Sequence, residues 1–206
     1  MTTRVSLVSP ATSEALREVR FGDGPLDPAG EARARRAAGA FPPETSAMTS
    51  PSVRCGSTAR ALGLVRTVAV PALAGCGMGR WRGRTLDDVA GTDPAALSLW
   101  LSDPAAAPHG GESVRDLRVR VGAWLDALRA EPSGRVVAVV EPDVVRAAVV
   151  HALAAGDAAF WRIDVRPLTV TEFSGRAGRW NVLSGRPLES GTGGESRPRA
   201  PDGHAS

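Results

Sequence analysis

The chain has 206 residues, a formal net charge of +3, two cysteines and three histidines. A chain of this length forms one domain that buries on the order of 70% of the surface its unfolded form would expose. All 25 basic residues are arginine, which excludes lysine-dependent sites such as phosphate loops and Schiff-base centres. The cysteines and histidines are too few and too scattered for a disulfide framework or a four-ligand zinc site, so we expect no metal and no cofactor.

Charge and apolar patterning also limit the partners and the compartment. The arginines are scattered and do not alternate with aromatic residues, which favours a solvated surface over a nucleic-acid site. The first residues lack a basic region followed by a long apolar run, and no window reaches ~18 apolar residues. We therefore expect a cytoplasmic protein without a nucleic-acid or membrane partner.

The N-terminal half predicts short strands that alternate with helices. Residues 4–8 form a β-branched apolar run that breaks at Ser9 and Pro10, as a buried strand ending in a loop does. Asp27 and Ser50 each precede a proline, which predicts capped helices. The helices are expected over residues 28–40 and 51–62, further strands over 46–49 and 67–70, and a Gly-rich loop over 71–84.

The C-terminal half predicts the remaining core elements. Apolar residues between 114 and 128 follow a three-and-four spacing that indicates an amphipathic helix. Residues 135–140 are continuously apolar, as in a strand covered on both faces. From residue 186 the chain has almost nothing apolar, so we expect one domain over 1–185 and a disordered tail over 186–206. A helix is expected over residues 144–154 and strands over 165–174 and 179–183.

Six short segments of the sequence read like motifs of one known protein family. Residues 49–59 read TSPSVRCGSTA and residues 7–13 read LVSPATS. Four more segments are RFGDGPLDPAG at 20–30, GRWRGRTLDDV at 79–89, GGES at 110–113 and VVEPDVVRA at 139–147. In sequence order, these segments resemble the motifs of the histidine phosphatase superfamily, the phosphoglycerate-mutase-like enzymes and phosphomonoesterases.

The resemblance covers residues 4–183 and implies a fold. It implies an α/β three-layer sandwich, in which helices flank a mostly parallel central sheet. Ligands of such sheets bind in a crevice at the carboxyl ends of the strands. We therefore expect Ser9, Arg54, Glu112 and Glu141 to converge at that edge.

The resemblance also implies which chemistry is missing. Family members use one histidine as the nucleophile, two arginines and a second histidine to hold the phosphate oxygens, and a carboxylate as the acid. The matching positions here hold Pro10 for the nucleophile, Ser9 for the first arginine, Glu141 for the second histidine and Gly75 for the carboxylate, while Arg54 is kept. A proline nitrogen cannot attack phosphorus and a glutamate repels phosphate. We expect an inactive or severely impaired phosphatase.

Two interpretations of the remaining polar residues stay open. In the first, Arg54, Arg20 and Ser113 form a rebuilt site for a small phosphorylated or anionic ligand, with Glu112 and His109 in the same cleft. In the second, the two arginines serve only helix capping and surface pairing.

Three function classes follow from this sequence. The protein is a non-catalytic binding or interaction module, a phosphomonoesterase with an altered active site that uses a water activated by Glu141, or a structural partner of an active paralogue. Because enzymes of the family commonly form dimers, a homodimer is also expected as a possible assembly.

Overall fold

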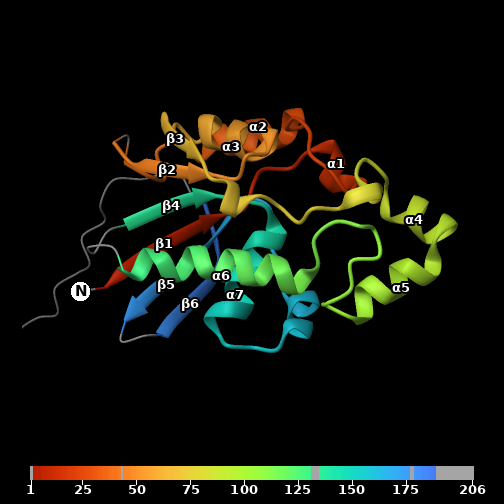
Figure 1. Cartoon of the computed structure of the whole chain (residues 1–206). Coiled ribbons are helices and arrows are strands. Elements are labelled where there is room, and N and C mark those ends of the chain that lie inside the picture. The colour runs from red at the N-terminus through yellow and green to blue at the C-terminus, as the bar shows by residue number, and fades with distance from the viewer. Residues whose placement is uncertain (1, 43, 131–134, 177–178, 189–206) are drawn as a thin grey trace, which may run out of the picture.

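The computed structural model describes residues 2–42, 44–130, 135–176 and 179–188. Its centre is a six-stranded sheet with the order β3-β2-β4-β1-β5-β6 (Figure 1). Strands β3, β2, β4 and β1 are parallel, whereas β5 runs antiparallel to β1 and β6 antiparallel to β5. The bounds are β1 (Thr3–Val8), β2 (Ser46–Thr49), β3 (Arg66–Ala69), β4 (Arg135–Val139), β5 (Thr169–Arg176) and β6 (Arg179–Pro187).

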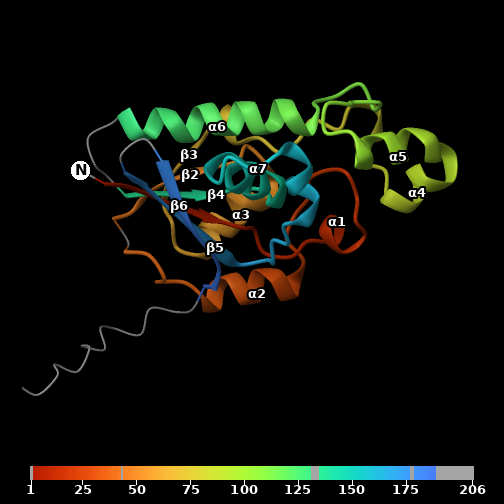
Figure 2. The same ribbon diagram turned by 90° about the horizontal axis from the view of Figure 1, so that it is seen from below.

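Helices cover both faces of this sheet. Figures 1 and 2 show α6 and α7 on one face and α2 and α3 on the other, with α4 and α5 set beyond one end. The α-helices are α1 (Glu14–Arg17), α2 (Pro28–Arg36), α3 (Val53–Ala61), α4 (Leu86–Thr92), α5 (Pro94–Ser102), α6 (Val114–Ala130) and α7 (Pro142–Ala152). Short 3-10 turns are η1 (Pro71–Leu73), η2 (Gly79–Trp81) and η3 (Asp157–Arg162). The expected α/β architecture with a mostly parallel sheet is confirmed.

The core follows from the alternation of side chains along the strands. Val5 and Leu7 of β1 are fully buried in the cluster that includes the apolar faces of α6 and α7. The neighbouring Val8 points to the opposite face and belongs to the cluster with Cys55 and Ala59 of α3. Leu7 and Val8 are both buried, so both faces are covered at the end of β1, whereas Arg4 near its start is exposed.

Some predicted boundaries are wrong. Helix α3 begins at Val53, and its N-cap is Ser52, whose Oγ accepts a hydrogen bond from the Cys55 amide at 3.3 Å. Ser50, the predicted cap, instead ends the strand segment and donates its amide to Val139. Both serines stand near a proline, so local sequence alone did not separate them.

Further differences concern the element ends. Helix α2 ends at Arg36 and β5 begins at Thr169, so both elements are shorter than predicted. Strand β6 reaches Pro187, and the Leu188 amide donates to Leu168 at 3.0 Å, which carries the fold past the expected boundary at 185. Residues 189–206 of the predicted tail lie outside the described residues. Among the described helices, none has the length and apolar character needed to span a membrane.

The corrected cap of α3 gives a stability test. Replacing Ser52 by Ala removes the hydrogen bond to the Cys55 amide and is expected to lower the free energy of unfolding by about 1 kcal/mol. Ser50→Ala is the matched control, because the buried Ser50 Oγ has no hydrogen-bond partner among the described residues. Urea unfolding of both variants measures the difference, and an equal or larger loss for Ser50→Ala would contradict the assignment.

Candidate functional site

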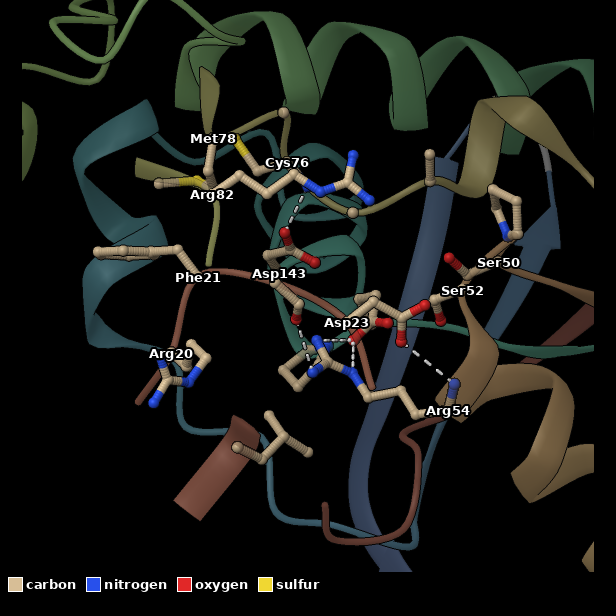
Figure 3. A pocket seen from close by; sticks show the side chains of 18 of the residues that line it. Arg20, Phe21, Asp23, Ser50, Ser52, Arg54, Cys76, Met78, Arg82 and Asp143 are labelled. Carbon is tan, nitrogen blue, oxygen red and sulfur yellow. Dashed lines mark hydrogen bonds and ion pairs between the residues drawn. The ribbon is translucent and has the colours of Figure 1, made fainter. Parts of the chain in front are cut away.

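A cavity of about 470 Å³ opens at the carboxyl edge of the parallel strands, and we call it the cleft. Its lining comes from the segment after α1, the start of α3, the loop after η1 and the start of α7. Phe21 and Met78 lie on the side opposite Ser50 and Ser52 (Figure 3). The loops at strand ends and the first turns of two helices therefore build the site, as expected for this sheet type.

An ion pair between Arg54 and Glu141 crosses the cleft. The Nε and Nη2 atoms of Arg54 lie 2.7 and 2.6 Å from Oε2 of Glu141, and Nη1 donates to the Gly22 carbonyl at 3.0 Å. The two residues are only 8% and 3% exposed. Burial by itself would lower the pKa of Arg54, but the Glu141 carboxylate outweighs it and raises that pKa. Arg54 therefore stays charged, and its charge is neutralised from within the chain.

A second carboxylate covers the start of α3. Asp23 accepts hydrogen bonds from the amides of Val53 and Arg54 at 2.5 and 3.2 Å. These amides belong to the first turn of the helix, where unpaired N–H groups and the helix dipole attract anions. The helix terminus thus already holds a negative group (Figure 3).

A third carboxylate, Asp143, lies at the start of α7. It accepts hydrogen bonds from the amides of Cys76 and Val144 at 2.6 and 2.8 Å. Burial, followed by repulsion from Glu141, raises the pKa of Asp143 to about 6 in spite of these two hydrogen bonds. Its carboxyl group therefore changes charge close to neutral pH.

Gly75 is where the loop passes against both acids. A Cβ atom at this position would lie 3.2 Å from Cγ of Glu141 and 3.4 Å from Oδ2 of Asp143. The first contact is tight and requires the Glu141 side chain to shift by a few tenths of an ångström, whereas the second is close to ordinary van der Waals contact. At the position that the family resemblance assigns to an acid, this wall has a glycine, and Asp143 is an acidic group beside it.

The residues at the end of β1 do not reach the cleft. Ser9 is 1% exposed, and its Oγ donates to the Arg166 carbonyl at 2.6 Å, on the side of β5. Pro10 is also buried, and its carbonyl accepts from the Leu168 amide at 3.4 Å. Ser9 thus stands at the predicted sheet edge, directly after β1, but its side chain bonds to the segment before β5 and is not among the lining residues of the cleft.

Glu112 and Ser113 of the GGES segment do not line the cleft, although Glu112 lies directly behind its wall, where Oε2 accepts from the Gly77 amide at 3.4 Å. Glu112 pairs with Arg120 through contacts of 2.8 and 2.7 Å. Ser113 accepts a hydrogen bond from the Asp116 amide at 3.1 Å in the first turn of α6. Among the described residues that line the cleft, Glu112 and Ser113 are absent, so neither meets Arg54.

His109 packs into an aromatic cluster. Its ring lies 5.0 Å from that of Trp81, and its Nδ1 accepts a hydrogen bond from the Gly111 amide at 3.0 Å. Burial, followed by the charge of Arg80, lowers the pKa of His109. His109 is thus a neutral core residue and is not among the lining residues of the cleft.

Arg20 does line the cleft, but its guanidinium is already bonded. Nη2 contacts Glu18 at 2.5 Å and Nη1 donates to the Gly83 carbonyl at 2.7 Å. Of the three predicted anion ligands, the structure brings Arg20 and Arg54 to one cavity and leaves Ser113 outside.

Sequence reasoning missed Asp23 and Asp143. Asp143 lies two residues after Glu141 in the first turn of a helix that begins with proline, which is a recognisable place for an acid. Asp23 gave no such signal, because it caps a helix 30 residues further along the chain. Over the described part of the chain, no group of three or more His, Cys, Asp or Glu side chains gathers as a metal site.

Comparison with known proteins shows the family of this chain. The family model described as the histidine phosphatase superfamily (branch 1) matches residues 11–186. The chain belongs to this superfamily. The bifunctional protein Rv2228c of Mycobacterium tuberculosis is 33% identical over 98 residues, which are 46% of this chain and 27% of that protein. The chain thus covers about a quarter of the length of the curated relatives that it matches.

Solved structures show the same fold at low identity. The mycobacterial glucosyl-3-phosphoglycerate phosphatase Rv2419c has a TM-score of 0.77 at 22% identity, covering 92% of this chain and 100% of that chain. The alpha-ribazole phosphatase from Shigella flexneri has a TM-score of 0.79 at 18% identity, covering 93% of this chain and 100% of that chain. At these identities, the likeness establishes the fold alone.

The raised pKa of Asp143 predicts a pH-dependent stability. Its pKa in the folded protein, about 6, lies above the ordinary value of 3.8, so folding favours the protonated form. This stabilisation is complete below about pH 4 and is lost as the pH rises through about 6. The difference in unfolding free energy between wild type and Asp143→Asn is expected to shrink by on the order of 2 kcal/mol across that range.

Urea unfolding at a series of pH values and constant ionic strength measures this difference. Asp87→Asn, which alters an exposed acid of α4, is the control and is expected to follow the wild type in parallel. If the Asp143→Asn curve also ran parallel to the wild type, Asp143 would not titrate in this range.

Proposed function

We propose that this histidine phosphatase family member is a binding or interaction module that does not hydrolyse phosphomonoesters. The observation that carries the proposal is the state of Arg54. Its Nε and Nη2 atoms both contact Glu141, and its Nη1 contacts a backbone carbonyl. The arginine that would grip a phosphate is already engaged with a carboxylate of the chain itself.

The backbone amides that face the cleft support the same proposal. Asp23 occupies the amides at the start of α3, and Asp143 occupies those of Cys76 and Val144. A phosphate dianion has to displace these acids or lie beside them, and like charges within about 4 Å repel by several kcal/mol at the effective dielectric of a protein surface. The cleft therefore favours ligands that are not dianionic.

Loss of the nucleophile adds to this argument. By resemblance, Pro10 stands at the position of the family's attacking histidine, directly before the range that the family model matches. Its ring nitrogen is part of the peptide bond and has no free lone pair. Losing the nucleophile of a covalent mechanism costs on the order of a millionfold in turnover.

The cleft nevertheless has the properties of a ligand site. Its volume of about 470 Å³ lies within the common range for small-molecule pockets, and Phe21, Trp100 and Phe160 give it an apolar wall. The buried Nε1 of Trp100 and Oγ of Ser50 have no hydrogen-bond partner among the described residues. Both atoms are covered by the protein itself, so we infer from the apolar wall a ligand with an apolar or aromatic body.

One observation favours a phosphomonoesterase with an altered site as the second candidate. Asp143 faces the cleft and its pKa of about 6 suits general acid–base work near neutral pH. It is better placed than Glu141 to activate a water, because Glu141 is bound to Arg54. The phosphatase names of the similar structures are consistent with this candidate.

The main proposal predicts no phosphatase activity. The purified protein is expected to hydrolyse simple phosphomonoesters no faster than Arg54→Ala, since Pro10 cannot accept a phosphoryl group. Turnover of p-nitrophenyl phosphate and of phosphorylated sugars measures both proteins side by side. Robust turnover that Arg54→Ala abolishes would overturn the proposal, and turnover lost in Asp143→Asn would support the second candidate.

A charge substitution tests whether Glu141 blocks anion binding. In Glu141→Gln, Arg54 keeps a neutral hydrogen-bond acceptor but loses its counter-charge. Affinity for inorganic phosphate is expected to rise by about tenfold or more, because a hydrogen bond to a charged group contributes about 1.5–3 kcal/mol. Isothermal titration with phosphate gives the dissociation constants.

The matched control is Glu112→Gln, which removes the carboxylate of another arginine pair outside the cleft. It is expected to leave phosphate affinity unchanged. Breaking a buried pair also destabilises a protein, so circular dichroism must show that Glu141→Gln is folded. A folded Glu141→Gln that binds phosphate no better than wild type would show that Glu141 is not the block.

A further inference from the structure

A second hollow lies outside the cleft and carries a strong positive charge. It has a volume of about 590 Å³ and lies between the C-terminal end of α2, the segment before β5 and the end of β6. Its charged lining residues are Arg33, Arg36 and Arg166, and we call it the arginine groove. It shares no lining residue with the cleft.

The three guanidinium groups of the arginine groove have no partner among the residues that the structure describes. No acidic side chain is among the described residues that line it. Within the described part of the chain, Arg33, Arg36 and Arg166 make no side-chain hydrogen bond or ion pair. Because Arg33 and Arg36 are three residues apart on a helix, they project from the same face.

Two arginines close to the groove in sequence form ion pairs with carboxylates. Arg35, which lies between the two on α2, pairs with Glu31 at 2.6 Å. Arg186 of β6 pairs with Glu172 at 3.3 Å. Arg35 and Arg186 thus have carboxylate partners, whereas Arg33, Arg36 and Arg166 have none among the described residues. Like charges that line one hollow repel each other, and a bound anion removes this repulsion.

The floor of the groove is formed by buried residues. Ala37 and Leu168 are 4% and 6% exposed, and Thr169 is buried beside them. Leu168 has φ of 55°, a left-handed backbone conformation that is uncommon for a residue with a branched side chain. The groove thus has a well-packed floor beneath three cations.

Hydrogen bonds from three directions fix the segment that carries Arg166. Its carbonyl accepts from Ser9 Oγ at 2.6 Å, and the Leu168 amide donates to the Pro10 carbonyl at 3.4 Å. The Leu188 amide donates to the Leu168 carbonyl at 3.0 Å. The backbone of this wall is therefore positioned before any ligand arrives, which reduces the ordering cost of binding.

We propose that the arginine groove is a binding site for a small molecule with a chain of phosphate groups. Three guanidiniums match three or more negative charges, and the planar guanidinium favours phosphate oxygens through paired hydrogen bonds. The volume is in the range of small-molecule pockets. This site is independent of the cleft and of the function proposed for it.

The test uses the full chain and sodium tripolyphosphate as the probe, by isothermal titration at constant ionic strength. The wild type is expected to bind it saturably, and Arg33→Gln, Arg36→Gln and Arg166→Gln are each expected to weaken binding by about tenfold or more. Arg35→Gln is the matched control, because it removes the same charge from the same helix outside the groove. Its affinity is expected to stay within about twofold of the wild type, because Arg35 does not line the groove and its charge is paired with Glu31.

Further arms identify the source of the phosphates and the outcomes that overturn the proposal. If ATP binds more tightly than tripolyphosphate, the groove also contacts the adenine ring. If the two bind equally, the phosphate chain alone is recognised. The proposal is overturned if the wild type shows no saturable binding or if Arg35→Gln weakens it as much as Arg36→Gln. It is also overturned if a single-stranded oligonucleotide binds more tightly than either probe and depends on the same arginines.

Discussion

The buried ion pair of Arg54 and Glu141 is the interaction on which the cleft depends. Arg54 lies in the first turn of α3 and Glu141 directly precedes α7, so the pair joins two strand-to-helix junctions at one sheet edge. A buried charge without a partner lowers the stability of a folded protein by several kcal/mol. Removing either residue would therefore leave the other as a destabilising buried charge. In an anion-binding site, a ligand supplies the negative charge only while it is bound. Here the chain supplies it permanently.

Other features of the cleft follow from that fixed charge. Glu141 places a negative group beside Asp143, and together with burial this repulsion raises the pKa of Asp143. The loop at Gly75 passes so close to both acids that a side chain there requires the Glu141 side chain to shift. The Glu141 carboxylate also raises the pKa of the buried Cys55 thiol, after burial itself, which makes that thiol a poor nucleophile. Burial and the Glu141 carboxylate thus together account for the raised pKa values of two neighbours, Asp143 and Cys55.

The sequence predicted those parts of the fold that depend on local patterns. The apolar run ending at Val8 and the three-and-four spacing in α6 depend on side-chain periodicity, and both elements are present as predicted. Helix α5 was missed because Leu99 and Leu101 are about half exposed, so its apolar residues form no stripe on one face. Helix α4 was also missed, although Thr85 begins a capping box that was available as a signal.

The site was predicted less well than the fold because its geometry depends on contacts between distant segments. The pairing of Arg54 with Glu141 joins residues 87 positions apart. The same is true of Ser9, which follows β1 as expected but turns toward Arg166, 157 positions away. The order of the motifs predicted which elements carry these residues. It could not predict where each side chain points, because that depends on hydrogen-bond partners from distant segments.

The cleft and the arginine groove treat positive charge in opposite ways. In the cleft, Arg54 and the amides at the starts of α3 and α7 each hold a carboxylate of the chain. In the groove, three arginines face one hollow with no carboxylate among the described lining residues. Ser9 and Pro10 connect the two regions, because they follow β1 toward the cleft edge yet bond to the wall of the groove. Three acids therefore oppose an anion locally in the cleft, whereas no described carboxylate does so in the arginine groove.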